Sequence, residues 1–440
     1  MNEIFNPEYE TMGREGLREL QFKRLQMTVR WVYENVPFHR ERWTAMKLKP
    51  ADVRSLEDLR KLPFTSKADF RAAYPYGLFA LPLDKVIRIH ATSGMMSNPT
   101  VVGYSRGDLN TWSEICARAA VAGGARFHDV AQIAYDYGLT TGGFGMHAGL
   151  ERVGATVIPA STGNTQRQLH IMRDFKTTVL VCTPSYAMHI VEVAPELGYD
   201  FKDLRLRVGL FGAEPWTNQL RDELEKRAGI SACDTYGLSE VIGPGVSYEC
   251  WNKDGLHVNE DHFLVEVVDP VTGEPVPDGK EGELVFTSLT KEALPVIRYR
   301  TGDLASLSNR PCACGRMFAR HSKVYARSDD MLIIRGINVF PSQVEAVLLD
   351  VEKVEPHYQI VLYREGALDQ MEVQIEVTPS FLPDAVKELQ GFQHHVEERL
   401  RQELGIRPRV RLVEPKTIPR STGKAERVID NRGPIRGPAT

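Results

Sequence analysis

The chain alternates between two spacings of hydrophobic positions. Residues 14–35 have the helical spacing of an amphipathic helix, formed by Leu17, Leu20, Leu25, Val29 and Val32. Short apolar runs rich in β-branched residues predict buried strands at 86–92, 130–137, 155–160, 178–184 and 207–213. Helices are predicted between them at 169–175 and 218–228. This alternation favours an α/β fold whose mainly parallel sheet binds ligands beyond the carboxyl ends of its strands.

The pattern changes twice toward the C-terminus. Residues 262–288 alternate polar and apolar positions between Gly and Pro turns, which predicts a smaller β-rich subdomain. After Arg327 the pattern is mixed again, with strands predicted at 331–336, 358–363 and 371–377 and helices at 342–349 and 384–404. We therefore predict a large N-terminal domain with α/β sheets at residues 1–327, followed by a small α+β C-terminal domain at 328–440.

Composition narrows the class of function. The 440 residues are 42% hydrophobic and 25% charged, and the formal net charge is −4 at pH 7. A protein that binds nucleic acid by neutralising phosphates is normally basic, so no nucleic-acid partner is expected. The sequence has no apolar run near the roughly 18 residues that span a bilayer, and its N-terminus lacks the regions of a signal peptide. We expect no membrane partner and predict a cytoplasmic location.

Five polar segments with small residues have the chemistry to hold a nucleotide. The first, at 92–100, follows a predicted strand, where backbone N–H groups and hydroxyls can face phosphates. The next two, at 212–216 and 234–240, offer small residues beside a flat ring, and a carboxylate four residues after Tyr236 that can hold Mg²⁺. The segment 299–303 places a carboxylate where it can accept ribose hydroxyls, and 419–424 ends in a lysine without forming a Walker A loop. An ordinary turn or a solvated lysine remains the alternative for each segment taken alone.

The order and spacing of these segments resemble the phenylacetate–CoA ligase family of adenylate-forming enzymes. The resemblance extends over nearly the whole chain, and its most specific stretches are TVVGYSRGDL, ERVGATVIP, GLFGAEPW, DTYGLSE, GELVFTSLTKEALPVIRYRTGDL, DDMLIIRGINVFPSQVE and PRSTGKAERV. It implies that ATP activates an aromatic, phenylacetate-like or similar acid as an acyl adenylate, which then passes to coenzyme A with release of AMP and pyrophosphate. The partners would be the acid, ATP and coenzyme A, with Mg²⁺ as cofactor, and a homodimer is left open.

The resemblance also implies roles for residues of this chain. Lys424 and Glu240 would be catalytic, Glu240 beside Mg²⁺ and Lys424 on a mobile C-terminal domain that turns about a hinge near Asp329. The expected ATP- and AMP-binding residues, the first two in the phosphate loop, are Ser93, Gly94, Gly212, Ala213, Glu214, Pro215, Asp234, Tyr236, Gly237, Asp303 and Arg327. Attack of a carboxylate on the α-phosphate brings two anions together, so an ammonium and Mg²⁺ would offset the charge.

Two segments depart from the family pattern. Met95-Met96-Ser97-Asn98 stands where the phosphate loop usually carries Thr-Thr-Gly-Lys, so two hydroxyls, a glycine and a charge are replaced. We expect weaker ATP affinity, because backbone N–H groups can still bind phosphates. Thr140 stands where the phenylacetate enzymes commonly have Phe, and the expected acyl pocket consists of Tyr135, Thr140 and Gly142. Such a pocket would accept a larger or more polar acid.

Four residues predict a metal site. Cys250-x6-His257 and Cys312-x-Cys314 offer three thiolates and an imidazole, a set suited to tetrahedral structural zinc. Reduced cysteines without metal remain the alternative. The remaining cysteines lie in or beside apolar runs and are predicted to be plain buried thiols: Cys116, Cys182 and Cys233.

Two other functions stay open from sequence alone. An adenylating enzyme that loads a carrier protein would share every ATP motif. A nucleotide- or acyl-binding protein with impaired catalysis is suggested by the altered phosphate loop. The first would transfer the acyl group to a carrier protein instead of free coenzyme A, and the second would release no AMP with any acid.

Overall fold

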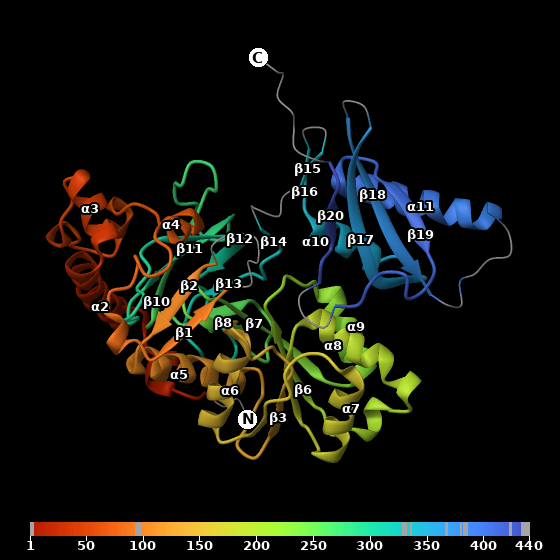
Figure 1. Cartoon of the computed structure of the whole chain (residues 1–440), viewed down its shortest axis with the longest axis horizontal. Coiled ribbons are helices and arrows are strands. Elements are labelled where there is room, and N and C mark those ends of the chain that lie inside the picture. Colours follow the sequence, from red (N-terminus) through yellow and green to blue (C-terminus); the bar gives the residue numbers. More distant parts are fainter. Residues whose placement is uncertain are drawn as a thin grey trace.

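The computed structural model describes residues 4–92, 99–327, 332–334, 337–365, 368–378, 381, 386–421 and 425–432. Within these residues, twelve strands form one large sheet (Figure 1). Its parallel half has the order β4-β3-β5-β6-β7, with β3 (Val130–Ile133), β4 (Thr156–Ile158), β5 (Val179–Cys182), β6 (Val208–Gly212) and β7 (Ser231–Leu238). The predicted parallel α/β sheet is confirmed.

Helices cover both faces of the parallel strands. Because side chains alternate along a strand, Val179 and Val181 of β5 face one core while Leu180 and Cys182 face the other. The first core includes side chains of α5 (Arg106–Ala122) and α6 (Gly142–Val153). The second includes side chains of α7 (Thr165–Asp174), α8 (Pro184–Val193) and α9 (Asn218–Ala228). The hydroxyls of Thr183 and Thr217 cap α8 and α9. Helix α8 begins directly beyond the carboxyl end of β5, and α9 begins after a short turn beyond the end of β6.

The sheet continues in antiparallel fashion beyond β7. The order is β8-β9-β13-β12-β11-β10, with β8 (Gly243–Glu249), β9 (Leu256–Val258), β10 (Phe263–Val268), β11 (Glu281–Ser288), β12 (Tyr299–Ser308) and β13 (Arg320–His321), and β14 (Ala326–Arg327) pairs with β12. The predicted hairpin-rich region is confirmed, but β13 joins it to β9 and so to the parallel strands. It is therefore part of the same sheet rather than a separate unit.

One strand assignment from the sequence is wrong. The run 86–92 contains β1 (Arg88–Ala91), which pairs only with β2 (Val101–Tyr104) in the described part of the chain. The two form an antiparallel ribbon, because the chain returns directly as β2 instead of crossing over through a helix. An apolar run of this length does not reveal which sheet it joins.

The N-terminal helices pack beside the antiparallel strands (Figure 1). They are α1 (Pro7–Glu10), α2 (Arg14–Asn35), α3 (Pro37–Ala45) and α4 (Lys67–Ala72). The bounds of α2 agree with the predicted helix, and its buried residues Leu25, Val29 and Val32 share a core with Phe263 and Leu284. Short 3-10 turns lie at Pro50–Asp52, Glu57–Lys61, Leu83–Lys85, Pro195–Leu197 and Phe201–Asp203.

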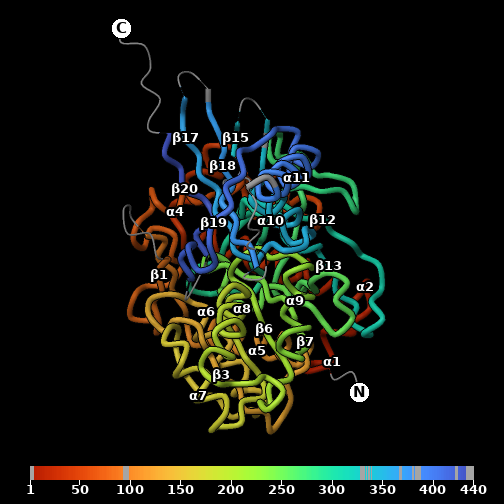
Figure 2. The backbone as a smooth tube through the Cα atoms, turned by 90° about the vertical axis from the view of Figure 1, so that its right-hand side faces the viewer, coloured from red at the N-terminus to blue at the C-terminus, as the bar shows by residue number. Residues whose placement is uncertain are grey.

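The C-terminal part has a sheet and a core of its own. The sheet order is β19-β18-β17-β20, with β17 (Val354–Glu365), β18 (Leu368–Val377), β19 (Arg409–Val413) and β20 (Val428–Asp430). Helices α10 (Pro341–Leu349) and α11 (Val386–Leu404) pack with this sheet, and β15 (Leu332–Ile334) pairs with β16 (Ile337–Val339). In both views this unit lies over α8 and α9 (Figures 1 and 2). None of the described helices is long and apolar enough to cross a membrane. The domain boundary after residue 327 stays a prediction.

Candidate active site

A first cavity lies where β6 and β7 end. Eight of the expected nucleotide residues line it together: Ala213, Glu214, Pro215, Asp234, Tyr236, Gly237, Asp303 and Arg327. Gly212 lies just beneath, and a Cβ there would be 2.0 Å from the carbonyl oxygen of Thr235 on β7. A Cβ on Gly237 would be 1.9 Å from the carbonyl oxygen of Gly243. Neighbouring backbone therefore leaves no room for a side chain at either position. The sequence had suggested instead that small residues here make room for a flat ring.

The charges of this cavity are paired around Asp303. Its carboxylate accepts a hydrogen bond from the Tyr236 hydroxyl at 2.6 Å and pairs with Arg327 Nη1 at 2.6 Å. Residues 303 and 327 face each other because β12 and β14 pair in that register. On the opposite side, burial raises the pKa of Asp234 to about 6, while the Lys323 ammonium 3.8 Å away favours its charged form.

A second cavity of about 380 Å³ adjoins the first. The predicted acyl-pocket residues Tyr135, Thr140 and Gly142 all line it. The two cavities share Ala213 and residues 235, 237 and 238, so a ligand can extend from one into the other. Its surface is mainly apolar, and the structure adds hydroxyl-bearing residues from distant segments that the sequence could not bring together: Thr92, Thr141, Thr162, Thr183, Thr235 and Ser239. Thr141 and Ser239 hold each other through a 3.0 Å hydrogen bond.

A buried lysine supports the end of β7. Glu240 follows Ser239 and is 7% exposed. The Lys291 ammonium donates to the backbone oxygen of Glu240 at 3.3 Å and lies 5.2 Å from the ring centroid of Tyr104. Burial lowers the pKa of Lys291 to about 8. Nothing in the sequence singles out this lysine, which lies in the connection between β11 and β12.

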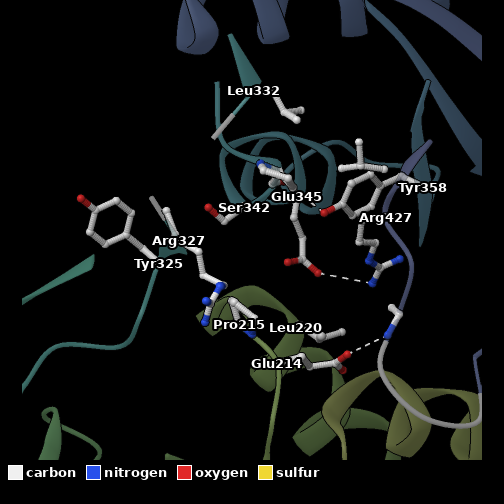
Figure 3. Close-up of a pocket in the computed structure, with 14 residues that line it drawn as sticks. Glu214, Pro215, Leu220, Tyr325, Arg327, Leu332, Ser342, Glu345, Tyr358 and Arg427 are labelled. Carbon is white, nitrogen blue, oxygen red and sulfur yellow. Dashed lines mark hydrogen bonds and ion pairs between the residues drawn. The ribbon is translucent and has the colours of Figure 1, made fainter. Parts of the chain in front are cut away.

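The C-terminal unit closes over the first cavity. A further cavity of about 370 Å³ between the two parts is lined on one side by Glu214, Pro215 and Arg327 and on the other by Glu345 and Arg427 (Figure 3). Burial raises the pKa of Glu345, and Arg427 lies 3.7 Å away. The backbone N–H of Ala425 donates to Glu214 Oε2 at 2.9 Å.

Four predicted residues lie outside the described part of the chain: Ser93, Gly94, Asp329 and Lys424. Their described neighbours are nevertheless informative. Thr92 lines the acyl-side cavity, and Ala425 contacts Glu214 at the nucleotide-side cavity. Thr92 and Ala425, the described neighbours of Ser93 and Lys424 in the chain, therefore both lie at the site.

The four predicted metal ligands meet in space. The ligand atoms of Cys250, His257, Cys312 and Cys314 all lie within 4.8 Å of one another, and all four residues are buried. The Sγ atoms of Cys250 and Cys312 are 3.8 Å apart, and Cys314 Sγ is 3.4 Å from His257 Nε2. Tetrahedral zinc with bonds of about 2.3 Å to sulfur and 2.0–2.1 Å to nitrogen separates its ligands by roughly 3.8 and 3.5 Å. The donor set and its spacing fit that ion. The predicted burial of Cys116, Cys182 and Cys233 is confirmed.

Comparison with known proteins identifies the family. A model described as "AMP-binding enzyme" matches residues 80–290, and one described as "AMP-binding enzyme C-terminal domain" matches residues 336–432. A phenylacetate-coenzyme A ligase of Thermus thermophilus is 48% identical over 98% of this chain and 100% of its own length. One of Escherichia coli is 48% identical over 96% of this chain and 97% of its own length. The chain belongs to the phenylacetate–coenzyme A ligase family. It is an AMP-forming acid–coenzyme A ligase.

Solved structures also define the conformation of this ligase. A 2-hydroxyisobutyryl-CoA ligase in the postadenylation state, in complex with 2-HIB-AMP, matches with a TM-score of 0.91 at 31% identity, over 97% of this chain and 92% of that one. The same protein with CoA in its thioesterification state matches over the same shares at the same identity, but with a TM-score of 0.72. The same protein is compared in both cases, so the arrangement of this ligase is more similar to that of the postadenylation structure.

Proposed function

We propose that this ligase activates arylacetic acids that carry a hydrogen-bonding substituent. The observation that supports this substrate class is the position of Thr140 in the wall of the cavity of about 380 Å³, directly beside the nucleotide-side cavity. Several other hydroxyls around this cavity already have partners, since Thr141 and Ser239 bond each other and Thr235 donates to the backbone oxygen of Phe211. The Thr140 hydroxyl forms a long bond of 3.4 Å to the backbone oxygen of Asp136. A hydroxyl or similar group on the ring of the acid would offer Thr140 a closer partner, which a plain phenyl ring cannot.

The reaction proceeds in two displacement steps. In the first, a carboxylate oxygen of the acid attacks the α-phosphorus of ATP, the bond to the β-phosphate oxygen breaks, and pyrophosphate leaves. In the second, the sulfur of coenzyme A attacks the acyl carbon, the bond to the phosphate oxygen breaks, and AMP leaves while the thiol proton passes to solvent. The two adjoining cavities would hold the acyl and adenosine parts of the acyl adenylate.

The nucleotide-side residues fit the adenosine part by their chemistry. In this proposal the carboxylate of Asp303 accepts the ribose hydroxyls, with Arg327 and Tyr236 fixing its orientation. Asp234 lies across the same cavity, where a carboxylate can accept from the adenine amino group. Lys424, Ser93 and Gly94 would bind phosphates, and Glu240 would bind Mg²⁺. Magnesium would neutralise phosphate charge during the displacement.

A screen of acids tests the substrate class. AMP release would be measured with ATP, Mg²⁺ and coenzyme A for phenylacetate, its 2-, 3- and 4-hydroxy derivatives, benzoate and 2-hydroxyisobutyrate. We expect at least one hydroxyphenylacetate to exceed phenylacetate in kcat/KM by about tenfold, since one satisfied polar group is worth roughly 1–3 kcal/mol. Thr140→Val keeps the shape of the side chain and removes its hydroxyl, so it should narrow that difference. A tenfold preference for phenylacetate over every hydroxylated acid would overturn the substrate class.

We also propose that Cys250, His257, Cys312 and Cys314 hold a structural zinc ion. Four protein ligands would leave no open coordination position, so the ion would have no catalytic role. It would join β9, which carries His257, to the loop that carries Cys312 and Cys314 between β12 and β13. Next to this loop, Arg316 forms a buried ion pair with Glu10 at 2.5 Å, which connects the same region to helix α1.

Metal analysis tests the zinc site independently of catalysis. We expect about one zinc per chain in protein purified without chelators, and less than a tenth of that in Cys314→Ser. Cys233→Ser is the matched control, because Cys233 is equally buried but lies outside the cluster. Less than half an equivalent of zinc in the unmodified protein would overturn this proposal. A cytoplasmic location and a homodimer stay predictions.

A further inference from the structure

The carboxylate of Glu214 joins the two parts of the ligase at the point where the C-terminal loop enters the site. Its Oε1 atom accepts from the backbone N–H of Ser185 at 2.8 Å, near the N-terminus of α8. Its Oε2 atom accepts from the backbone N–H of Ala425 at 2.9 Å, and Figure 3 marks this bond below the cavity between the two parts. Each carboxylate oxygen thus holds one backbone donor, one from the large part and one from the small part.

Glu214 lies between two cavities and at the N-terminus of α8, and both positions bear on its bond to Ala425. Glu214 lies beside Pro215 in the wall that separates the nucleotide-side cavity from the cavity between the two parts. Thr183 already satisfies the N–H of Tyr186 at the start of α8, and Glu214 satisfies that of Ser185 next to it. A carboxylate at a helix N-terminus is favoured by the helix dipole, which holds Glu214 in place before it meets the loop. The bond to Ala425 is therefore made by a side chain that is already oriented.

We infer that Glu214 is a positioning residue for adenylation, which fixes the C-terminal unit against the large part through the backbone N–H of Ala425. This inference rests on the proposed role of Lys424. Ala425 follows Lys424 directly in the chain, so the bond to the N–H of residue 425 acts next to the proposed catalytic lysine. The structure is more similar to the postadenylation structure than to the thioesterification structure of the related ligase, so the bond between Glu214 and Ala425 belongs to the arrangement proposed for adenylation. Glu214 should consequently matter more for the first step than for the second.

Separate assays of the two steps test this role. Adenylation is followed by exchange of pyrophosphate into ATP with phenylacetate present, and thioester formation by the reaction of supplied phenylacetyl-AMP with coenzyme A. Glu214→Gln retains one acceptor oxygen and should slow exchange about tenfold, whereas Glu214→Ala should slow it about a hundredfold. Both variants should lose clearly less activity in thioester formation from supplied adenylate than in exchange, because the bond to Ala425 belongs to the arrangement proposed for adenylation. That second reaction also demonstrates that the variants are folded.

A matched control and a kinetic distinction complete the assay. Glu196→Gln makes the same chemical change at the same interface, in an exposed pair with Lys416, and should leave both steps unchanged. A loss of equal size in both steps would indicate a merely structural role for Glu214. A higher KM for ATP with unchanged kcat would indicate a role only as cavity wall. Either result overturns the positioning role, as does unchanged exchange.

A measurement without catalysis separates this inference from the proposed function. All six native cysteines are buried, so dyes attached to cysteines introduced at the exposed positions Lys226 on α9 and Gln402 on α11 report the distance between the two parts. We expect Glu214→Ala to broaden this distance distribution, and Glu196→Gln to leave it unchanged. If the unmodified ligase shows no acid-dependent exchange, the proposed function fails. The distance distributions still decide whether Glu214 holds the loop, and identical distributions would overturn it.

Discussion

Replacement of Lys291 by Met should remove a rise in the unfolding free energy of the large part that the unmodified protein shows between pH 8 and pH 10.5. The ammonium is 4% exposed, and burial lowers its pKa from the ordinary value of 10.5 to about 8. One pKa unit corresponds to about 1.4 kcal/mol, so the shift corresponds to about 3 kcal/mol. Between pH 8 and 10.5 the unfolded chain binds more protons at this residue than the folded chain. The unfolding free energy of the unmodified protein therefore rises with pH in that window.

The variant lacks this contribution because Met does not titrate. The difference in unfolding free energy, variant minus unmodified, should accordingly fall by about 3 kcal/mol between pH 8 and pH 10.5. Urea unfolding followed by tryptophan fluorescence measures it, since all five tryptophans precede residue 252 and report on the part that contains Lys291. Lys280→Met, at an exposed position, is the control and should show a difference that is independent of pH. A difference for Lys291→Met that stays constant within about 1 kcal/mol over the window would refute the reasoning.

The same substitution should slow catalysis. Lys291 holds the backbone of Glu240, which is proposed to bind Mg²⁺, through a charge-assisted hydrogen bond. Loss of such a bond costs roughly 1.5–3 kcal/mol, so adenylation should fall by about ten- to a hundredfold. The buried ammonium of Lys291 lowers stability at neutral pH, and we expect that it is retained because it supports Glu240. An unchanged rate of adenylation in Lys291→Met would show that Glu240 does not depend on this lysine.

Three further substitutions follow from the site. Burial lowers the pKa of His321 to about 4, so the stability that its neutral form contributes is present above pH 6.5 and is lost as the pH falls toward 4. In urea unfolding, His321→Gln should therefore reduce the fall in unfolding free energy between pH 6.5 and pH 4. Gly237→Ala puts a Cβ 1.9 Å from the carbonyl oxygen of Gly243 and should abolish AMP binding in calorimetry, and normal binding would show that the strands can separate there. Thr140→Phe should shift the ratio of kcat/KM toward phenylacetate, whereas an unchanged ranking of acids would place Thr140 away from the bound ring.

Local patterns predicted local structure well. Helix α9 has the predicted bounds, 218–228, because a capping threonine precedes it and a left-handed glycine follows it. The parallel strands were recognisable from β-branched runs between helices. The connection of β9 to β13 was not, because a pairing between residues about 60 positions apart leaves no local trace. The same limit explains β1, whose sequence resembles a central strand although it pairs only with β2 in the described structure.

Residues of the site were predictable where chemistry and spacing are distinctive. The cysteine and histidine pairs fall into this class, as do Asp303 and Tyr236. The threonines of the acyl-side cavity come from segments between residues 92 and 235, and each alone is an ordinary polar residue. Lys291 was missed for the related reason that burial of a lysine depends on long-range packing. The sequence therefore predicted which groups meet the nucleotide better than which groups meet the acid.

The contacts between the two parts of the ligase bear on the proposed turn of the C-terminal unit between adenylation and thioester formation. The large part contributes carboxylates of α8 and the following turn, and the small part contributes His357, which meets Glu192 at 2.6 Å, and Lys416, which meets Glu196 at 2.6 Å. The Lys416–Glu196 pair is exposed and is worth about 0–1 kcal/mol, because water replaces the lost partner when the two separate, whereas the His357–Glu192 pair is largely buried. An apolar interface would instead lose about 25 cal/mol for every Å² exposed, which would favour one arrangement strongly. Polar contacts thus keep the two arrangements close in free energy, and a single well-oriented carboxylate such as Glu214 can then determine where the loop lies during adenylation without preventing its release.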